Sequence, residues 1–225
     1  MKLLIDDAHI EQIKKIYEIF PVDGVTTNPT ILYKVGRKPF AVLKEIREFI
    51  GENSEMHVQA TATTAEGMVE DAKFILNQLG EKTFIKIPAI EEGFKAMKIL
   101  HEEKIKFTAT AVYSPMQAFI SAKAGASYTA PYVNRLDNLG YDGVKIAEEI
   151  HDIFCENDLE TEVLAASFKN SQQVLELCKY GIGAATAAPE VIFSLAKNKI
   201  AESAVDDFIS DFSKLVGEGK TMKDC

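Results

Sequence analysis

Cysteine is scarce in this chain, and long apolar runs are absent from it. The 225 residues include three cysteines, Cys155, Cys178 and Cys225, an odd number without a CxxC pair. This pattern suggests neither a disulfide framework nor a zinc site. The apolar stretch in the opening residues MKLLIDD stops after three residues, and no later segment approaches the roughly 18 apolar residues of a membrane span. We therefore expect a cytoplasmic protein that is neither secreted nor embedded in a membrane.

Positive charge is also in deficit. There are 25 Lys and Arg against 34 Asp and Glu, and the formal net charge of −9 argues against a general nucleic-acid-binding protein. An anionic substrate would need only a local cluster of positive charge. With 47% hydrophobic and 26% charged residues, the composition is that of a globular protein with a large core. No low-complexity linker or proline-rich seam divides the chain, so we expect one domain over residues 1–225.

Short β-rich runs alternate with helical patterns along the whole chain. Helical segments such as 8–20 and 64–79 carry apolar residues at helical period, and Ser114-Pro115 is a typical helix start. We predict eight strands, at residues 2–6, 24–27, 56–60, 83–87, 107–112, 128–133, 162–167 and 183–187. Eight β/α alternations predict an α/β fold, a (β/α)8 TIM barrel, with an open doubly wound sheet as the alternative. No GxGxxG motif follows the first strand, which removes the usual nucleotide-binding form of that alternative.

One predicted helix has no place in such a barrel. Residues 201–216 carry a continuous apolar stripe at helical period. A closed barrel has no ninth unit, so this additional C-terminal helix either folds over the barrel's own surface or packs on a neighbouring subunit. We favour the neighbouring subunit and therefore expect a homo-oligomer.

Lys86 stands inside the short apolar run TFIKIP at residues 83–88. Strand alternation places Phe84 and Lys86 on one face of this run. Desolvation lowers the pKa of a lysine from about 10.4 and creates a neutral amine that can attack a carbonyl. The alternative is a lysine on an edge strand with its amine in water. Lys2 and Lys106 stand at strand starts, where barrel residues serve stability, whereas Lys86 lies near a carboxyl end, and this location favours a functional role.

The carboxyl ends of the predicted strands are unusually polar. They carry, in chain order, Asp6, Thr26, Thr27, Asn28, Gln59, Thr61, Lys86, Thr110, Tyr132, Asn134, Arg135 and Ser167. Each admits a structural alternative. Asp6 could cap the first helix alongside Asp7, and the Asn-Pro step after strand two could be a plain turn. The threonines could fill the barrel, and Arg135 could pair with Asp137. Their convergence around one buried amine is harder to explain structurally, and we predict an active site at this face.

Seven segments spread over nearly the whole chain form a specific pattern: LIDD, GVTTNPTI, QATATTAEGM, FIKIP, TAVYSPMQA, APYVNRLD and AASFKN. Together they resemble the transaldolase family of class I aldolases, and more narrowly its fructose-6-phosphate aldolase subgroup. The resemblance implies a TIM barrel whose Schiff-base lysine lies on the fourth strand, where the strand count independently places Lys86. It also implies ten-subunit assemblies in which the C-terminal helix packs on a neighbour. We expect neither a cofactor nor a metal.

The resemblance assigns catalytic roles to residues of this chain. Lys86 forms the imine with the substrate ketone. Asp6, Gln59 and Thr110 arrange the catalytic water that carries protons. Tyr132 is the acid/base partner.

The resemblance also assigns the binding of sugar phosphate substrates. Asn28 holds hydroxyl groups of the dihydroxyacetone unit, and we group Thr26 with it as substrate-binding. Arg135 and Ser167 bind the phosphate of the aldehyde product.

A few positions separate the two activities of the family. Transaldolases usually carry glutamate where this chain has Gln59, phenylalanine where it has Tyr132, and serine or glycine around Ala130 and Asn134. These differences favour the aldolase, so we expect reversible cleavage of fructose 6-phosphate to dihydroxyacetone and glyceraldehyde 3-phosphate. The alternatives are a transaldolase of the pentose phosphate pathway and a barrel that binds or isomerises sugar phosphates without a covalent step. Thr108, and a proline one residue late after strand eight, depart from the family pattern and bear on aldehyde preference.

Overall fold

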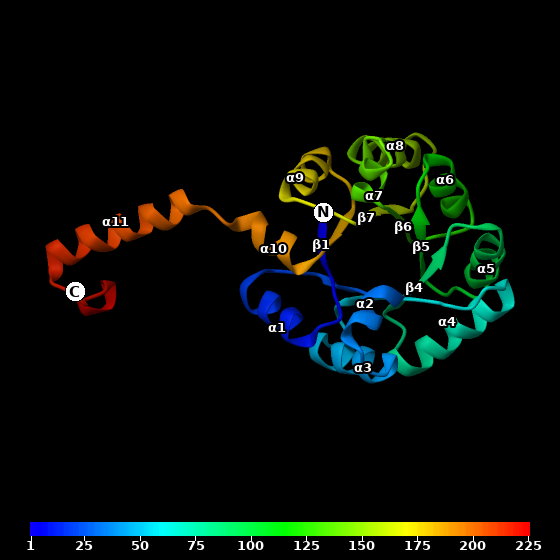
Figure 1. The fold of residues 1–225 in the computed structure, drawn as a ribbon, viewed down its shortest axis with the longest axis horizontal. Helices are drawn as coiled ribbons and strands as arrows, with labels where there is room; N and C mark the ends of the chain where they lie inside the picture. The colour runs from blue at the N-terminus through cyan, green and yellow to red at the C-terminus, as the bar shows by residue number, and fades with distance from the viewer.

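Eight parallel strands close into a barrel in the computed structural model, which describes residues 1–225 (Figure 1). The strands are β1 (Lys2–Asp6), β2 (Gly24–Thr26), β3 (Glu55–Gln59), β4 (Thr83–Pro88), β5 (Phe107–Val112), β6 (Tyr128–Pro131), β7 (Glu162–Ala165) and β8 (Ala184–Ala187). Each strand pairs with its neighbours in chain order, and β8 returns to β1 through the register Lys2 to Ala184. The predicted (β/α)8 TIM barrel is therefore confirmed, and the open doubly wound sheet is wrong.

Eleven helices accompany the strands, and all but the last surround the barrel. They are α1 (Ile10–Ile19), α2 (Pro29–Val35), α3 (Pro39–Ile50), α4 (Ala65–Leu79), α5 (Glu91–Glu102), α6 (Pro115–Lys123), α7 (Val133–Asn138), α8 (Gly143–Glu156), α9 (Ser171–Tyr180), α10 (Pro189–Ala196) and α11 (Lys199–Val216), followed by a 3-10 turn at Met222–Asp224. Local signals set several starts: Ser114 accepts a hydrogen bond from the Gln117 backbone before Pro115, and Thr64 caps α4 in the same way.

Two predicted strands run two residues too far. The segments 128–133 and 162–167 end as strands at Pro131 and Ala165, and the first is shortened because α7 already begins at Val133. Beyond those ends only a single bridge joins Tyr132 to Ala166. The chain thus leaves the sheet just where the predicted site residues of these two segments stand.

The strands divide the apolar interior into two parts. Their outer faces pack against the helices in a cluster of 43 buried residues. Inside the barrel lies a small apolar cluster of Leu4, Phe84, Tyr128, Leu164 and Ala184. Polar side chains occupy the barrel above and below this cluster. We call the end at the amino termini of the strands the floor, and the end at their carboxyl termini the mouth.

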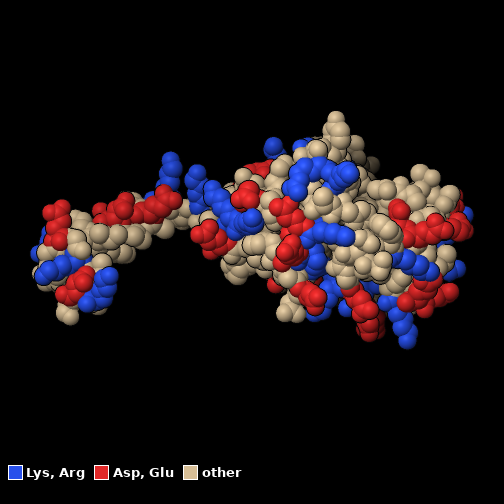
Figure 2. Space-filling model, turned by 90° about the horizontal axis from the view of Figure 1, so that it is seen from below, with Lys and Arg blue, Asp and Glu red and all other residues tan.

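The additional C-terminal helix is present and leaves the barrel. Asn198 caps α11 by accepting hydrogen bonds from Ile200 and Ala201, and none of its residues is buried. Figures 1 and 2 show α11 as an arm that stands apart from the barrel, with acidic and basic side chains interspersed along the visible face. Its apolar residues remain open: Ile200 is 82% and Leu215 80% exposed. The helix therefore does not fold over its own barrel. No helix of the structure, α11 included, is long and apolar enough to cross a membrane.

Candidate active site

A cavity of about 340 Å³ opens at the mouth of the barrel. It is lined by Asp6, Asn28, Pro29, Thr30, Gln59, Lys86, Ala111, Tyr132, Arg135, Ala166 and Ser167. Of the nine residues to which the sequence assigns catalytic or substrate-binding roles, seven line this cavity, and Thr26 and Thr110 do not. Both stand directly behind it, hydrogen-bonded to residues that line it. The predicted residues thus meet around one space, although they come from seven different strands or the loops that follow them.

Lys86 projects from β4 into this cavity. Its side chain is buried, with 5% of the residue exposed, and its Nζ donates a hydrogen bond to the Thr27 carbonyl oxygen at 2.9 Å. No salt bridge of the structure involves Lys86. Because β4 pairs with β3 on one side and β5 on the other, the alternative of an exposed lysine on an edge strand is wrong. The amine faces the cavity and forms no salt bridge.

Asp6 ends β1 beside this amine. Its Oδ1 accepts a hydrogen bond from Thr26 Oγ1 at 2.7 Å, and Thr26 lies at the same distance from Thr186. Burial raises the pKa of Asp6 above its usual range, and the Lys86 charge and the Thr26 hydrogen bond oppose that shift. Asp6 does not cap the first helix: Asp7 instead accepts hydrogen bonds from the two backbone N–H groups that follow it.

Tyr132 follows β6 and lines the same cavity. Its hydroxyl is 2.8 Å from Thr110 Oγ1 on β5, and the Arg135 guanidinium lies over its ring, 4.7 Å from the centroid. The β5 backbone is irregular next to Thr110, with a register shift between Ala109 and Val112 and a left-handed Ala111 at φ 54°. A phenol and a hydroxyl in contact at the cavity edge can relay a proton.

Arg135 supplies positive charge at the outer part of the cavity. Its guanidinium donates to the Tyr113 hydroxyl at 3.2 Å, so the alternative of a surface pair with Asp137 is wrong. Asp137 instead accepts hydrogen bonds from the Gly143 backbone and the Gln173 amide. Ser167 lines the same cavity and has a left-handed backbone at φ 62°, which is unusual for serine. A guanidinium and a hydroxyl in one cavity wall suit a phosphate.

Asn28 and Gln59 complete the cavity on the side of β2 and β3. The Asn28 side-chain oxygen caps α2 by accepting from the Ile31 backbone at 3.0 Å, which confirms a local structural role for this position. Its amide N–H groups make no hydrogen bond to the protein and remain available for a ligand. Gln59 pairs in register with Lys86 and also keeps its side-chain amide unbonded.

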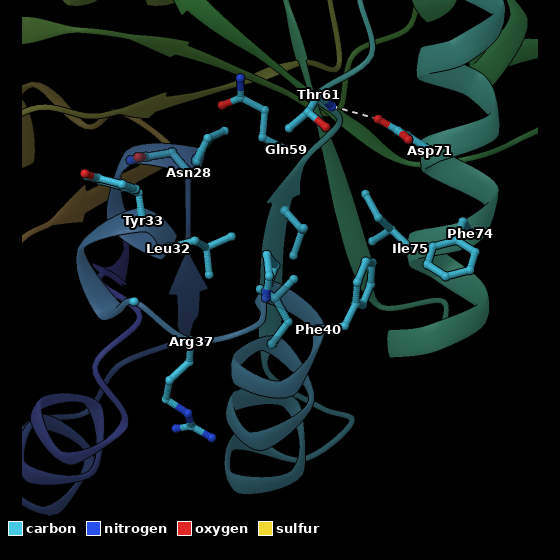
Figure 3. Close-up of a pocket in the computed structure, with 15 residues that line it drawn as sticks. Asn28, Leu32, Tyr33, Arg37, Phe40, Gln59, Thr61, Asp71, Phe74 and Ile75 are labelled. Atoms are coloured by element: carbon cyan, nitrogen blue, oxygen red, sulfur yellow. Dashed lines mark hydrogen bonds between the residues drawn. The ribbon is translucent and has the colours of Figure 1, made fainter.

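A second cavity of about 590 Å³ adjoins the first between α2, α3 and α4. Figure 3 shows Asn28 and Gln59 at one end of it and the apolar side chains of Leu32, Phe40, Phe74 and Ile75 around the rest. Thr61 lies here rather than at the amine, and its backbone N–H donates to Asp71. This polar strand end therefore does not join the candidate site.

Two features near the site were not predicted from the sequence, namely the left-handed backbone of Ala111 and the buried His57. Nothing predicts the left-handed Ala111, because alanine rarely adopts that conformation. His57 is fully buried below the cavity. Its place could have been inferred, since strand period puts it on the face of Gln59. The structure contains no group of three or more histidine, cysteine or carboxylate side chains that could hold a metal ion.

A comparison with known families matches almost the full chain. The family model described as Transaldolase/Fructose-6-phosphate aldolase matches residues 3–223. The chain belongs to this family. The resemblance noted in the sequence is thereby confirmed, and the enzyme is of transaldolase or aldolase type. Both activities are included in the description of the family, so the match alone does not separate them.

Similar proteins point to the same family. A probable transaldolase of Hydrogenobaculum sp. (strain Y04AAS1) is 39% identical over 215 residues, which cover 96% of this chain and 98% of the relative. A probable transaldolase of Geotalea uraniireducens (strain Rf4) shows the same identity over 96% of this chain and 99% of the relative. One from Clostridium botulinum (strain Hall) is 36% identical over 98% of this chain and all of the relative. The barrel and the arm thus both lie within the region shared with these relatives.

Proposed function

We propose that this family member is a class I aldolase that reversibly cleaves fructose 6-phosphate into dihydroxyacetone and glyceraldehyde 3-phosphate. The observation that carries the proposal is the setting of Lys86, a buried amine without a salt bridge that faces a polar cavity at the mouth of the barrel. A buried lysine of this kind is suited to imine formation.

The reaction begins at C2 of the ketose. The neutral Lys86 amine attacks this carbon, and loss of water gives an iminium ion. The C3–C4 bond then breaks, its electron pair moves to the iminium nitrogen, and the C4 hydroxyl loses its proton as the aldehyde forms. Protonation of the resulting enamine at C3 and hydrolysis by water release dihydroxyacetone and restore Lys86. Tyr132 exchanges the protons, and Asp6, Gln59 and Thr110 hold the water through which they pass.

The remaining polar residues bind the substrate. Arg135 and Ser167 hold the phosphate of the aldehyde half, because a guanidinium and a hydroxyl in one wall fit its oxygens. Asn28 donates its free amide N–H groups to hydroxyls of the dihydroxyacetone half, and Thr26 fixes the carboxylate of Asp6 next to it. Phosphate binding at one end and imine formation at the other orient the ketose across the cavity.

Borohydride trapping tests the covalent step. Sodium borohydride added with fructose 6-phosphate should leave a reduced adduct on Lys86, found by mass spectrometry of the peptide that contains it. The protein incubated with borohydride alone is the control. If binding is retained and no adduct forms, the protein is a barrel that binds or isomerises sugar phosphates without a covalent step, and the proposal is wrong.

A transaldolase is the second candidate, and the relatives' names favour it, since they are called probable transaldolases. In favour of the aldolase, Gln59 and Tyr132 stand where transaldolases usually carry glutamate and phenylalanine. A phenol can protonate the enamine and let water finish the reaction, whereas phenylalanine cannot. An assay of glyceraldehyde 3-phosphate release with and without erythrose 4-phosphate decides between the two. Release that depends strictly on the acceptor would identify a transaldolase, one that acts in the pentose phosphate pathway.

The arm α11 supports a proposal on assembly. Its apolar stripe has no buried residue in the single chain and is mostly exposed, and such a stripe is normally covered by another subunit. We therefore expect a homo-oligomer, a decamer by family resemblance, in which α11 packs on a neighbour. Deletion after Ile200 should dissociate it in sedimentation experiments, whereas deletion after Gly217, which spares the helix, should not. A monomeric full-length protein would contradict this assembly.

The free cysteines bear on the cellular compartment of the protein. All three cysteines are free and exposed, which suits a reducing compartment, and we propose the cytoplasm. Expression with a compartment-specific thiol probe would check it.

A further inference from the structure

His57 is a buried titratable side chain that the proposed reaction does not use. It is fully buried in the barrel interior, and its Nδ1 lies 2.9 Å from Thr108 Oγ1. Its ring stacks on Phe84 with centroids 4.7 Å apart and an angle of 10° between the planes. Because β4 lies between β3 and β5, the contact of His57 with Thr108 bridges the two outer strands over Phe84.

This bridge lies directly below the reactive amine. Phe84 and Lys86 are two residues apart on β4 and share its interior face. Lys86 is in register with Thr108 on β5 and with Gln59 on β3, two residues after His57. Thr108 is also fully buried. The pair of His57 and Thr108 therefore closes the barrel beneath the cavity and separates Lys86 from the floor.

The groups around the ring favour its neutral form. Glu55 Oε2 on the same strand is 3.5 Å from Nε2, but Nε2 has no hydrogen-bond partner. Lys2 on β1 and Tyr128 on β6 bond to Glu55 below the ring, and Lys86 stands above it. The Lys106 amine lies 5.8 Å from the centroid of the Phe84 ring. Burial lowers the pKa of His57, Lys86 and Lys2 lower it further, and Glu55 opposes them.

We propose that His57 controls the charge beneath Lys86: its neutral ring leaves the space below the amine uncharged, whereas its protonation opposes the iminium cation. The inference rests on the proposed Schiff-base function. With Nε2 facing Glu55, Nε2 carries the proton and Nδ1 accepts from the Thr108 hydroxyl. A second proton would turn Nδ1 into a donor and reverse that bond. It would also place a cation beneath the iminium nitrogen in the buried interior. Two positive charges repel each other strongly there, so protonation of His57 and formation of the iminium ion oppose each other.

The test compares the wild type with the double variant His57→Phe/Thr108→Val. This variant keeps the ring over Phe84 and removes both polar partners, so no buried hydroxyl is left unpaired. The measurement is the yield of the imine adduct trapped with cyanoborohydride, which survives in mild acid, from about pH 8 downwards. At pH 8 the two yields should agree within about threefold. Once the pH is low enough to protonate His57, the wild-type yield should fall at least about fivefold further than that of the variant. Parallel profiles would overturn the proposal.

A second measurement uses no activity and needs no His57 variant. Nitrogen-15 NMR of the histidine rings reports the tautomer and proton affinity of His57, with the other three histidines as references. We expect the Nε2–H tautomer near pH 7. In Lys86→Met the proton affinity of His57 should rise at least about threefold, because a cation above the ring has been removed. An unchanged affinity, or no protonation in either protein, would overturn the coupling. A changed affinity without any trapped adduct would instead refute the aldolase and leave the coupling in place.

Discussion

The two ends of the barrel carry the same three kinds of titratable side chain and hold them in opposite ways. The floor has Lys2, Glu55 and Tyr128, and the mouth has Lys86, Asp6 and Tyr132. At the floor the three groups bond to one another. At the mouth each is held by a neutral partner, namely the Thr27 carbonyl, the Thr26 hydroxyl and the Thr110 hydroxyl. The ionisable groups at the floor therefore pair with one another, whereas those at the mouth remain available to a substrate.

Mutual pairing fixes the charges at the floor. Burial by itself would raise the pKa of Glu55, but His57 and Lys2 outweigh it and lower that pKa to about 2. Burial raises the pKa of Tyr128 to about 12. Neither group changes its protonation near neutral pH, so the floor can only serve stability. At the mouth, the raised pKa of Asp6 marks a carboxylate whose charge is poorly compensated.

The lysines give the sharpest test of this difference. Lys86→Met should reduce kcat/KM for cleavage by at least about 1,000-fold, because no other amine can form the imine. Lys2→Met should keep kcat/KM within about threefold but lower the free energy of unfolding by about 1–2 kcal/mol, because Glu55 loses its partner. Steady-state kinetics and urea unfolding measure both effects. If Lys2→Met inactivated a folded enzyme, the division between floor and mouth would fail.

Tyr132 at the mouth and Tyr128 at the floor should differ in the same way as the lysines, with a smaller effect on the cleavage rate. Tyr132→Phe should lower cleavage about 100-fold through loss of the proton donor, and it should raise sugar transfer to erythrose 4-phosphate relative to cleavage. Tyr128→Phe should leave both rates unchanged and lower the free energy of unfolding by about 1 kcal/mol, since a hydrogen bond is lost. An unaltered ratio of transfer to cleavage in Tyr132→Phe would remove the role proposed for this phenol.

The contributions of Glu55 and Asp6 to stability change with pH in opposite directions. The Glu55 pKa is lowered from 4.5 to about 2, so its stabilisation is present above about pH 4.5 and is lost as the pH falls towards 2. The pKa of Asp6 in the folded protein is raised above 3.8. Its contribution to stability therefore declines as the pH rises from 3.8 towards that higher pKa. At pH 7, Glu55→Gln should destabilise by about 1–2 kcal/mol, and Asp6→Asn should stabilise by about 1 kcal/mol while it slows cleavage roughly tenfold. Urea unfolding at pH 7 and pH 4 checks the opposite signs.

Much of the fold could be predicted because its signals are local. Strand and helix periods alternate eight times, and the polar residues follow the apolar runs, so the barrel and the position of Lys86 both emerge from the sequence. The arm was also predicted, since its apolar stripe is one of the clearest in the chain. Elements of this kind depend on the spacing of residues within about 20 positions.

The unpredicted features depend on contacts between distant residues. Arg135 bonds to Tyr113 rather than to Asp137 because α7 turns it over the mouth. The left-handed Ala111 follows from the bulge in β5, and no residue type announces it. Likewise, the contact of His57 with Thr108 joins strands that are not neighbours in the sheet. The strand period predicts on which face of the sheet a side chain lies, but it does not predict which other side chain it contacts.

The parallel pairing of β1 with β8 also constrains how the chain folds. Lys2 lies in register with Ala184, so the first strand gains its second neighbour only after the eighth strand has been made on the ribosome. Until that moment both ends of the sheet expose unpaired backbone groups, which other chains can pair with. Slow synthesis, or a pause before the eighth strand, should therefore promote aggregation of nascent chains more than any single substitution in the finished barrel.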